Sequence, residues 1–181
     1  MYIVTSSEEL VMKLVKKNNC EYWLNDNGQR HGEYKSWYEN GQLISHCFHV
    51  NGERHGEFKS WWGDGQLGGH SFFVNGRYHG EAKLWWYENG QLRRHCFFVN
   101  DEFHGEFKWW LNDGQLRDHC FYVNDVRHGE DKWWYENGQL SVHCFYVNGD
   151  IVRDLIEEPV TDEDKFLMSL ETGAKWLDIN S

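Results

Sequence analysis

Histidine and cysteine are the residues of this chain whose types and spacing come closest to a chemical site. His-Cys pairs recur at regular intervals, and one further copy carries His70-Ser71 instead. The pairs are His46-Cys47, His95-Cys96, His119-Cys120 and His143-Cys144. Both side chains are ligands that zinc prefers, and zinc needs four of them at about 2.0–2.3 Å.

Strand geometry argues against a metal centre built from these pairs. Adjacent residues of a β-strand point to opposite faces, so the two members of a pair cannot bind one ion. Equivalent residues of successive copies would lie two strands apart, roughly 10 Å, and a disulfide tolerates a Cα separation of only about 7 Å. We therefore predict no metal, no cofactor and no disulfide. Each Cys is expected to be a small core residue and each His a hydrogen-bonded side chain.

A second histidine series precedes glycine in every copy. We predict that these imidazoles hydrogen-bond the backbone of a loop. A pH-sensing ladder is the alternative, because protonating all the regularly placed imidazoles would add a large charge. The residues are His31, His55, His79, His104 and His128.

Carboxylates recur with equal regularity, in a Glu-x-Lys motif such as Glu57 and Lys59. Acid–base catalysis would need one perturbed pair in a cleft, whereas this motif is present five times. Gly63-Asp64-Gly65 lacks the Lys-Ser/Thr of a phosphate-binding loop, and no unique Ser or Cys has a matching base. Because no singular polar constellation is apparent, we predict that the protein is not an enzyme and has no catalytic residue.

The elements that position these residues are repeats. His-Gly-Glu recurs at intervals of 24, 24, 25 and 24 residues, and Gly-Gln-Leu recurs with it. Asn40-Gly41 and Asp64-Gly65 are typical of two-residue hairpin turns in which both residues take positive φ. Short aromatic and β-branched runs flank each turn, which predicts about eleven strands in a meander, stacked one repeat after another. A degraded half-repeat at residues 20–28 precedes five full copies.

The proposed register gives the sheet two different faces. A turn at Asn40-Gly41 pairs Glu39 with Gln42, Trp37 with Ile44, and so on to Glu33 with Phe48. Side chains then alternate between faces. The uniform face, nearly identical in all copies, carries Glu33, Lys35, Trp37, His46, Phe48 and Val50. The variable face carries Tyr34, Ser36, Tyr38, Ser45, Cys47 and His49.

Aromatic residues on the variable face are the candidates for contact with a partner. We expect the uniform face to form a stacking ladder, whereas the variable face is free to carry specificity. Aromatic side chains dominate the binding energy of many interfaces. The predicted partner-binding residues are Trp62, Trp109, Trp133, Phe98, Tyr122 and Tyr146.

Composition and charge exclude several classes of partner. The formal net charge is −11, which argues against nucleic acid and against an anionic membrane surface, since both attract clustered Lys and Arg. Aromatic residues make up 17% of the chain, so burial can offset chain entropy and disorder is not expected. Five cysteines without a recognisable secretory signal predict reduced thiols and an intracellular, cytoplasmic location.

The repeat resembles a known family. Tyr38-Glu39-Asn40-Gly41-Gln42-Leu43, followed by Phe48, Asn51-Gly52 and Gly56, is similar to the MORN repeat. More narrowly, it resembles the variant in bacterial antitoxins of the YwqK type and in MORN repeat proteins of giant DNA viruses. That resemblance implies a single-layer twisted sheet of hairpins, and binding or scaffolding rather than chemistry. For a viral protein, it would place the chain in the host cytoplasm or the virion.

Both ends of the sheet are predicted to be capped by a helix. Ser6-Ser7-Glu8-Glu9 is typical of a capping box and would open a helix over residues 8–17. A second helix would begin near Thr161 and stop before Gly173. The predicted organisation is a helical cap at 1–19, the MORN-like repeats at 20–149 and a second helical cap at 150–181. The fold class is thus mainly β, an elongated single-layer antiparallel meander with a short helix at each end.

The predicted function is that of a non-enzymatic, Trp-rich protein-binding or scaffolding module, which also allows self-association as a homodimer. Two alternatives follow from the resemblance. One is an antitoxin-like neutraliser of a single cognate protein. The other is a membrane-apposed lipid-binding protein, which the acidic charge disfavours.

Overall fold

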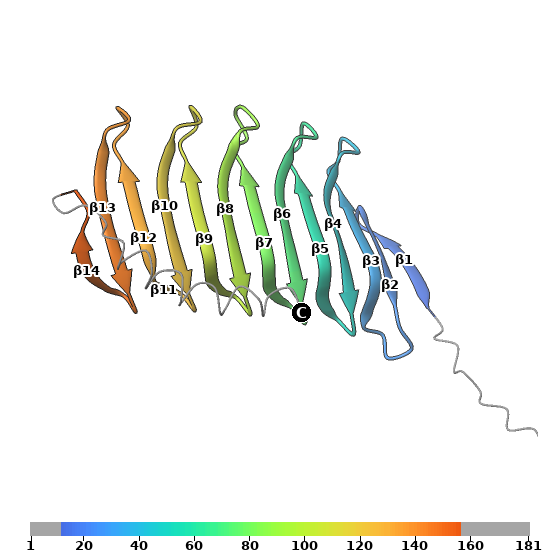
Figure 1. The fold of residues 1–181 in the computed structure, drawn as a ribbon. Coiled ribbons are helices and arrows are strands. Elements are labelled where there is room, and N and C mark those ends of the chain that lie inside the picture. Colours follow the sequence, from blue (N-terminus) through green and yellow to red (C-terminus); the bar gives the residue numbers. More distant parts are fainter. Residues whose placement is uncertain (1–11, 157–181) are drawn as a thin grey trace, which may run out of the picture.

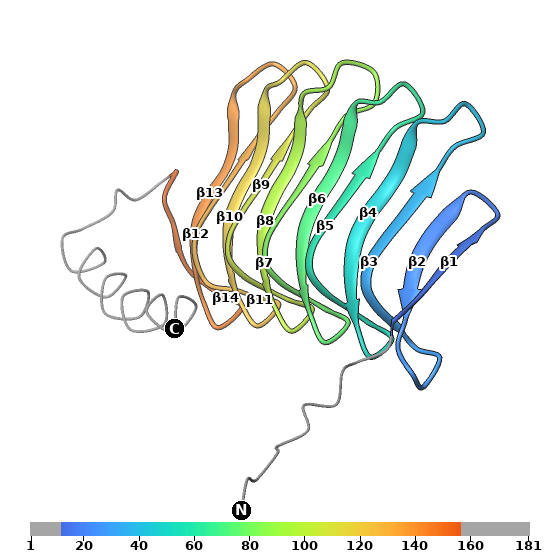
Figure 2. The same ribbon diagram turned by 90° about the vertical axis from the view of Figure 1, so that its right-hand side faces the viewer.

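The computed structural model describes residues 12–156, which form one open antiparallel sheet of 14 strands (Figure 1). The strands are β1 (Lys13–Lys17), β2 (Cys20–Leu24), β3 (Arg30–Trp37), β4 (Leu43–Val50), β5 (Glu53–Trp61), β6 (Leu67–Val74), β7 (Arg77–Trp85), β8 (Leu92–Val99), β9 (Glu102–Trp110), β10 (Leu116–Val123), β11 (Val126–Arg127), β12 (Gly129–Trp134), β13 (Leu140–Val147) and β14 (Asp150–Asp154). Each strand pairs with its neighbour in sequence, and β11 with β12 forms one interrupted strand beside β10. The predicted meander is confirmed. The strands are also bent, so the sheet is curved (Figure 2).

The predicted N-terminal helix is wrong where the structure describes it. Lys13–Lys17 is strand β1, paired with β2 through a turn at Asn18 and Asn19, whose φ angles are 50° and 56°. These two left-handed residues end any helix, and the exposed edge of β2 offers hydrogen bonds that outweigh a weak helical preference. The C-terminal helix near Thr161 lies outside the described residues. The sheet also extends beyond 20–149, because β1 and β14 both belong to it.

The hairpin turn at Asn40-Gly41 differs from the prediction. Tyr38 N donates to Gln42 O at 2.8 Å and Gly41 N to Tyr38 O at 3.0 Å, so the loop spans residues 39–41 and only Gly41 has positive φ. The extra loop residue produces a bulge that pairs Trp37 with Leu43. Beyond the bulge, the predicted register from Ser36–Ser45 to Glu33–Phe48 is confirmed.

The two-residue turns with positive φ lie at the opposite end of the hairpins. Asn51 and Gly52 have φ angles of 50° and 91°, and the flanking Val50 pairs with Glu53. This backbone twist matches that of the strands, which is why Asn-Gly is favoured in such turns. In two later copies the glycine is replaced by Asp101 and Asp125, at φ 76° and 63°.

The uniform face carries a row of identical ion-pair networks. In each copy one glutamate Oε1 accepts hydrogen bonds from a lysine two residues along its own strand and from a histidine on the next strand. In the first copy, Glu33 lies 2.7 Å from Lys35 Nζ and 2.8 Å from His46 Nε2. The others join Glu57 to Lys59 and His70, Glu81 to Lys83 and His95, Glu106 to Lys108 and His119, and Glu130 to Lys132 and His143. The lysine thus pairs within its strand, and the predicted histidine hydrogen bonds are confirmed.

The predicted contact of the second histidine series with the loop is confirmed in two copies. Asn51 N donates to His31 Nδ1 at 3.4 Å, and Asn148 N donates to His128 Nδ1 at 3.3 Å.

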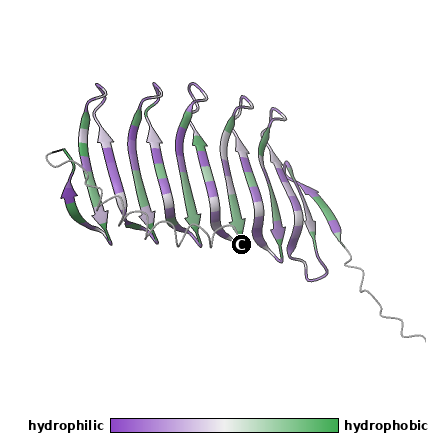
Figure 3. Cartoon of the chain, viewed as in Figure 1, coloured by the Kyte–Doolittle hydropathy of each residue, from purple (hydrophilic) through white to green (hydrophobic). Residues whose placement is uncertain are grey.

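The core lies on the variable face, which reverses the expected division of labour. Within the strands, every buried side chain belongs to this face, including Cys47, Cys96 and Cys120 at 2%, 0% and 0% exposure. On the uniform face, Phe48 and Phe72 remain 40% and 36% exposed. Hydrophobic and hydrophilic residues consequently alternate along the strands (Figure 3). The single sheet has no second layer in the described residues, so side chains of adjacent strands bury one another.

Rings and guanidinium groups on the variable face stack in a line across the strands. Tyr78 lies between Phe73 and Phe98, with centroid separations of 4.3 and 5.1 Å. Phe98 in turn packs 4.6 Å from Phe103. Arg30 lies over Tyr22 and Tyr34, and Arg54 over Phe58 and Phe73.

Candidate functional site

Four of the six predicted partner-binding residues gather on the variable face of β9–β13. They are Trp109, Tyr122, Trp133 and Tyr146. Phe98 lies nearby but is only 8% exposed, so its ring serves the core and has little surface for a partner. Trp62 lies far along the sheet, at the end of β5, where it packs against Tyr87 at 5.6 Å.

A pocket of about 280 Å³ opens beside Trp133 and Tyr146. Residues of β10, β11, β12 and β13 line it. Because β11 and β12 form one interrupted strand, the pocket spans three adjacent strand positions of the sheet. The lining residues are Asp118, Arg127, Asp131, Trp133, Val142 and Tyr146. Its wall is therefore part aromatic and part ionisable.

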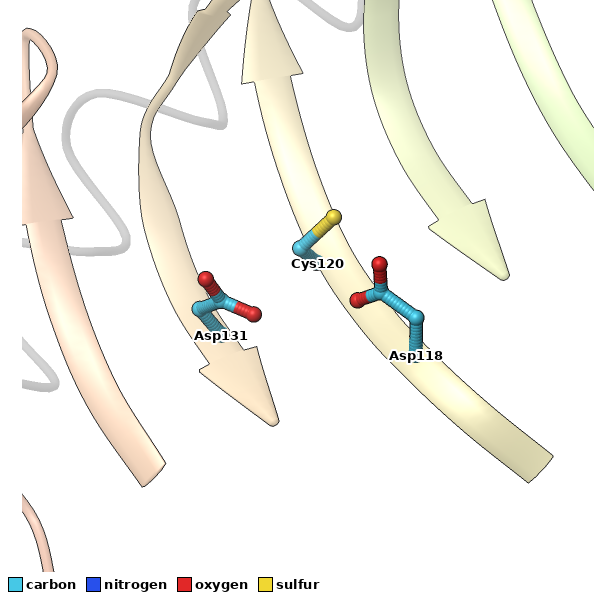
Figure 4. Close-up of side chains that lie close together, drawn as sticks. All are labelled: Asp118, Cys120 and Asp131. Carbon is cyan, nitrogen blue, oxygen red and sulfur yellow. The ribbon is translucent and has the colours of Figure 1, made fainter. Parts of the chain in front are cut away.

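Two carboxylates approach each other in this pocket (Figure 4). Asp118 on β10 and Asp131 on β12 lie close to Cys120, with ligand atoms of all three within 4.8 Å of one another. Asp131 is only 2% exposed, and Asp118 Oδ1 is enclosed without a hydrogen-bond partner in the described part of the chain. Burial raises the pKa of both carboxyl groups, and the charge of Asp131 adds to the effect on Asp118.

Arg127 is the cation that faces this pair. Its Nη1 donates a hydrogen bond to Asp131 Oδ2, and its guanidinium lies 5.6 Å from the ring centre of Tyr146. Burial alone would lower the pKa of Arg127, but its contacts with Tyr122 and Asp131 outweigh burial and raise it. The same burial, with the neighbouring Cys120, raises the pKa of the Tyr122 hydroxyl to about 12. Arg127 thus stays charged and Tyr122 stays neutral.

The chemistry of Asp118, Cys120 and Asp131 does not suit a transition metal. Burial first, and then the charge of Asp118, raises the pKa of the Cys120 thiol to about 12, whereas a cysteine ligand must be a thiolate. Arg127 already occupies an oxygen of Asp131. Only two carboxylates of the cluster remain as ligands, fewer than the three or four protein ligands of ordinary zinc sites.

A second arginine lies beside the pocket, between two tryptophans. Arg117 occupies the bulge of β10, and its guanidinium carbon is 4.7 Å from the ring centre of Trp133 and 5.9 Å from that of Trp109. Trp133 keeps 38% of its surface exposed. An arginine stacked on an accessible indole is a common arrangement at protein interfaces.

Sequence reasoning missed Asp118, Arg127 and Asp131, and the expectation that no singular polar constellation exists is wrong. A signal was present, because Asp131 occupies the position of Tyr34, Phe58, Ala82 and Phe107 in the other copies. A buried aspartate in an otherwise apolar series indicates a specific task, since an unpaired charge is costly to bury. What the sequence left open was the register between β10 and β12, which pairs Asp118 with Trp133 and so brings it close to Asp131.

Comparison with known proteins supports the interpretation of the repeats. A family model described as MORN repeat variant matches residues 30–51, 78–100, 103–124 and 127–148. A search of curated proteins found no match. Among residues 12–156, no helix has the length and apolar character needed to cross a membrane. The four matched segments coincide with hairpins of the observed sheet, and the chain therefore carries repeats of the MORN variant type.

Proposed function

We propose that this protein is a non-enzymatic scaffold that holds a protein partner on the variable face of its sheet, around the pocket beside Trp133. MORN repeats generally act as protein- or membrane-binding scaffold modules. The observation that supports a protein partner is the gathering of Trp109, Trp133 and Tyr146 around two aspartates whose positions hold no aspartate in any other copy. Interfaces are enriched in such aromatic and arginine side chains.

The net charge of the chain favours protein over lipid. At −11, the molecule repels the anionic lipids that draw peripheral proteins to a membrane. The same charge attracts basic proteins and speeds their association at low salt. An antitoxin-like role is a special case of this proposal, in which the partner is one cognate enzyme that binding inactivates.

The experiment is affinity capture of the full chain from its native cell, followed by mass spectrometry of the proteins retained. Trp133→Ser is the test variant and Trp62→Ser the matched control, because the two indoles are 38% and 37% exposed. We expect one stoichiometric partner with the wild type and with Trp62→Ser, and several-fold less with Trp133→Ser. Equal loss in both variants would show that the pocket is not the interface.

Two further outcomes would contradict the proposal. Sedimentation of the purified chain with lipid vesicles, unaffected by Trp133→Ser, would indicate a membrane scaffold. Recovery of the chain alone, at twice its monomer mass or more, would indicate that the sheet chiefly binds a second copy of itself.

A further inference from the structure

We infer that the pocket between β10 and β13 receives an arginine side chain of the partner, stacked on the rings of Trp133 and Tyr146 and hydrogen-bonded to Asp118. This inference rests on the proposed function and names the chemical group that the site recognises. Three observations support it: the charge of the pocket, an unsatisfied hydrogen-bond acceptor, and the aromatic residues that line the pocket.

The charged groups that line the pocket do not balance. Two carboxylates, Asp118 and Asp131, face one guanidinium, that of Arg127. If both are ionised, one negative charge is left without a counter-ion inside the pocket. Buried charges are normally paired, so an empty position for a cation is more stable when filled.

The unsatisfied acceptor lies on Asp118. Its Oδ1 is enclosed and has no hydrogen-bond partner among residues 12–156, whereas Asp131 Oδ2 accepts from Arg127. Leaving a buried acceptor unpaired destabilises the fold, and supplying a donor removes that cost. A guanidinium can supply that donor, because it carries five N–H groups in a rigid plane.

The walls favour arginine over lysine or a metal ion. Trp133 and Tyr146 line the pocket, and a planar, weakly hydrated guanidinium stacks on aromatic rings better than a compact ammonium does. The variable face already uses this contact within the chain. Arg54 lies 4.9 Å from the ring centre of Phe58, Arg93 lies 4.4 Å from that of Trp86, and Arg127 itself lies over Tyr146.

The experiment is a titration followed by NMR of the tryptophan indole N–H signals of the full chain, with the Trp133 signal assigned through Trp133→Phe. The ligand is N-acetyl-arginine amide, and its citrulline counterpart is the control because it has the same shape without the charge. We expect a saturable shift of the Trp133 signal with the arginine compound and none with the citrulline compound. Equal shifts with both, or none with either, would overturn the inference.

Asp118→Asn tests the assigned hydrogen bond. We expect it to weaken binding of the arginine compound by on the order of tenfold or more, the size that follows from losing one charged hydrogen bond. Asp26→Asn, in the exposed turn after β2, should bind like the wild type. Circular dichroism spectra of both variants serve as the check that they fold. Unchanged binding by Asp118→Asn would place the arginine elsewhere.

The two proposals fail in different ways. If the arginine compound does not bind but the natural partner is still lost with Trp133→Ser, the scaffold function stands and this inference falls. If the arginine compound binds at Trp133 while no protein partner is captured, the pocket chemistry is right and the proposed function is wrong.

Discussion

At the scale of single residues, the charged side chains of the pocket on the variable face lower the stability of the fold. Four copies have Tyr34, Phe58, Ala82 and Phe107 at the position where the fifth has Asp131. Only the fifth copy therefore buries a carboxylate there, which lowers the stability of the fold. Apolar residues at this position pack against their neighbours, as Phe107 does edge to face with Phe103 at 5.5 Å. Residues that lower stability in one copy alone are candidates for function, because binding sites often conflict with optimal packing.

Replacing Asp118 by asparagine should therefore raise the stability of the free protein near neutral pH. Burial and the charge of Asp131 raise the pKa of Asp118, so the folded state binds a proton there more tightly than the unfolded state does. Its contribution to stability is present at low pH and is lost as pH rises through the raised pKa. We expect Asp118→Asn to increase the melting temperature by a few degrees at pH 7, with a gain that shrinks toward pH 4.

Thermal melts at the two pH values measure this, with Asp26→Asn as the exposed control. A lower melting temperature at pH 7 would mean that the carboxylate makes a stabilising contact. A higher melting temperature at pH 7 together with weaker binding of the arginine compound would identify Asp118 as a residue that serves recognition and lowers stability.

At the scale of elements, the turns explain which parts of the fold could be predicted. The hairpins, their order and their central register follow from the 24-residue period and from alternation along strands. The turn geometry was assigned to the wrong end, because Asn40-Gly41 and Asn51-Gly52 read alike as dipeptides. Only Asn51 takes positive φ, since the first loop gains a third residue and a bulge. Leu14 and Val15 likewise fit the apolar pattern of an amphipathic helix. They form a strand instead, because that segment pairs with the edge of β2.

The two kinds of turn should respond differently to the same substitution. Asn75 has a φ angle of 49°, whereas Asn112 is not among the residues with positive φ. A Cβ-branched or alanine side chain in the left-handed region is strained, and asparagine tolerates it better. We expect Asn75→Ala to reduce the free energy of unfolding by about 1 kcal/mol and Asn112→Ala to change it far less. Urea denaturation of both variants gives the comparison, and equal losses would refute the assignment.

The glutamate networks of the uniform face predict sensitivity to acid. For Glu106, burial tends to raise the pKa, but hydrogen bonds from Lys108 and His119 outweigh it and lower the pKa below 4.5. A lowered pKa stabilises the fold above the ordinary value, and this stabilisation is lost as pH falls through the folded value. Glu106→Gln should cost about 0.2–1 kcal/mol at pH 7, as cross-strand pairs do, and almost nothing near pH 3.

Glu136→Gln is the control for that experiment, since the Glu136 side chain is 85% exposed in a loop. Denaturant midpoints measured from pH 7 to pH 3 should converge for wild type and Glu106→Gln. A difference that persists at pH 3 would mean that Glu106 acts through packing rather than charge.

At the scale of the whole molecule, the sheet is a one-dimensional array. Within residues 12–156 each strand pairs with the next one along the chain, except that β11 and β12 both pair with β10, and strand pairing joins no distant repeats. Stability in such arrays is close to a sum of nearest-neighbour terms, so the loss of one repeat lowers stability without abolishing the fold. The binding site, by contrast, belongs to particular repeats, because no other copy has an aspartate at the position of Asp118 or of Asp131.

Removing one repeat at two different places should separate these properties. Deleting residues 51–74 joins Val50 to Asn75, which occupies the position of Asn51, and removes β5 and β6. Deleting residues 100–123 joins Val99 to Asn124 in the same way, but removes Trp109 and Asp118 with β9 and β10. Both proteins should keep a β-sheet circular dichroism spectrum and melt at similarly reduced temperatures. Only the first should still bind the arginine compound and the natural partner. If both bind, recognition resides in the repeat itself; if neither does, it depends on the full length of the sheet rather than on one pocket.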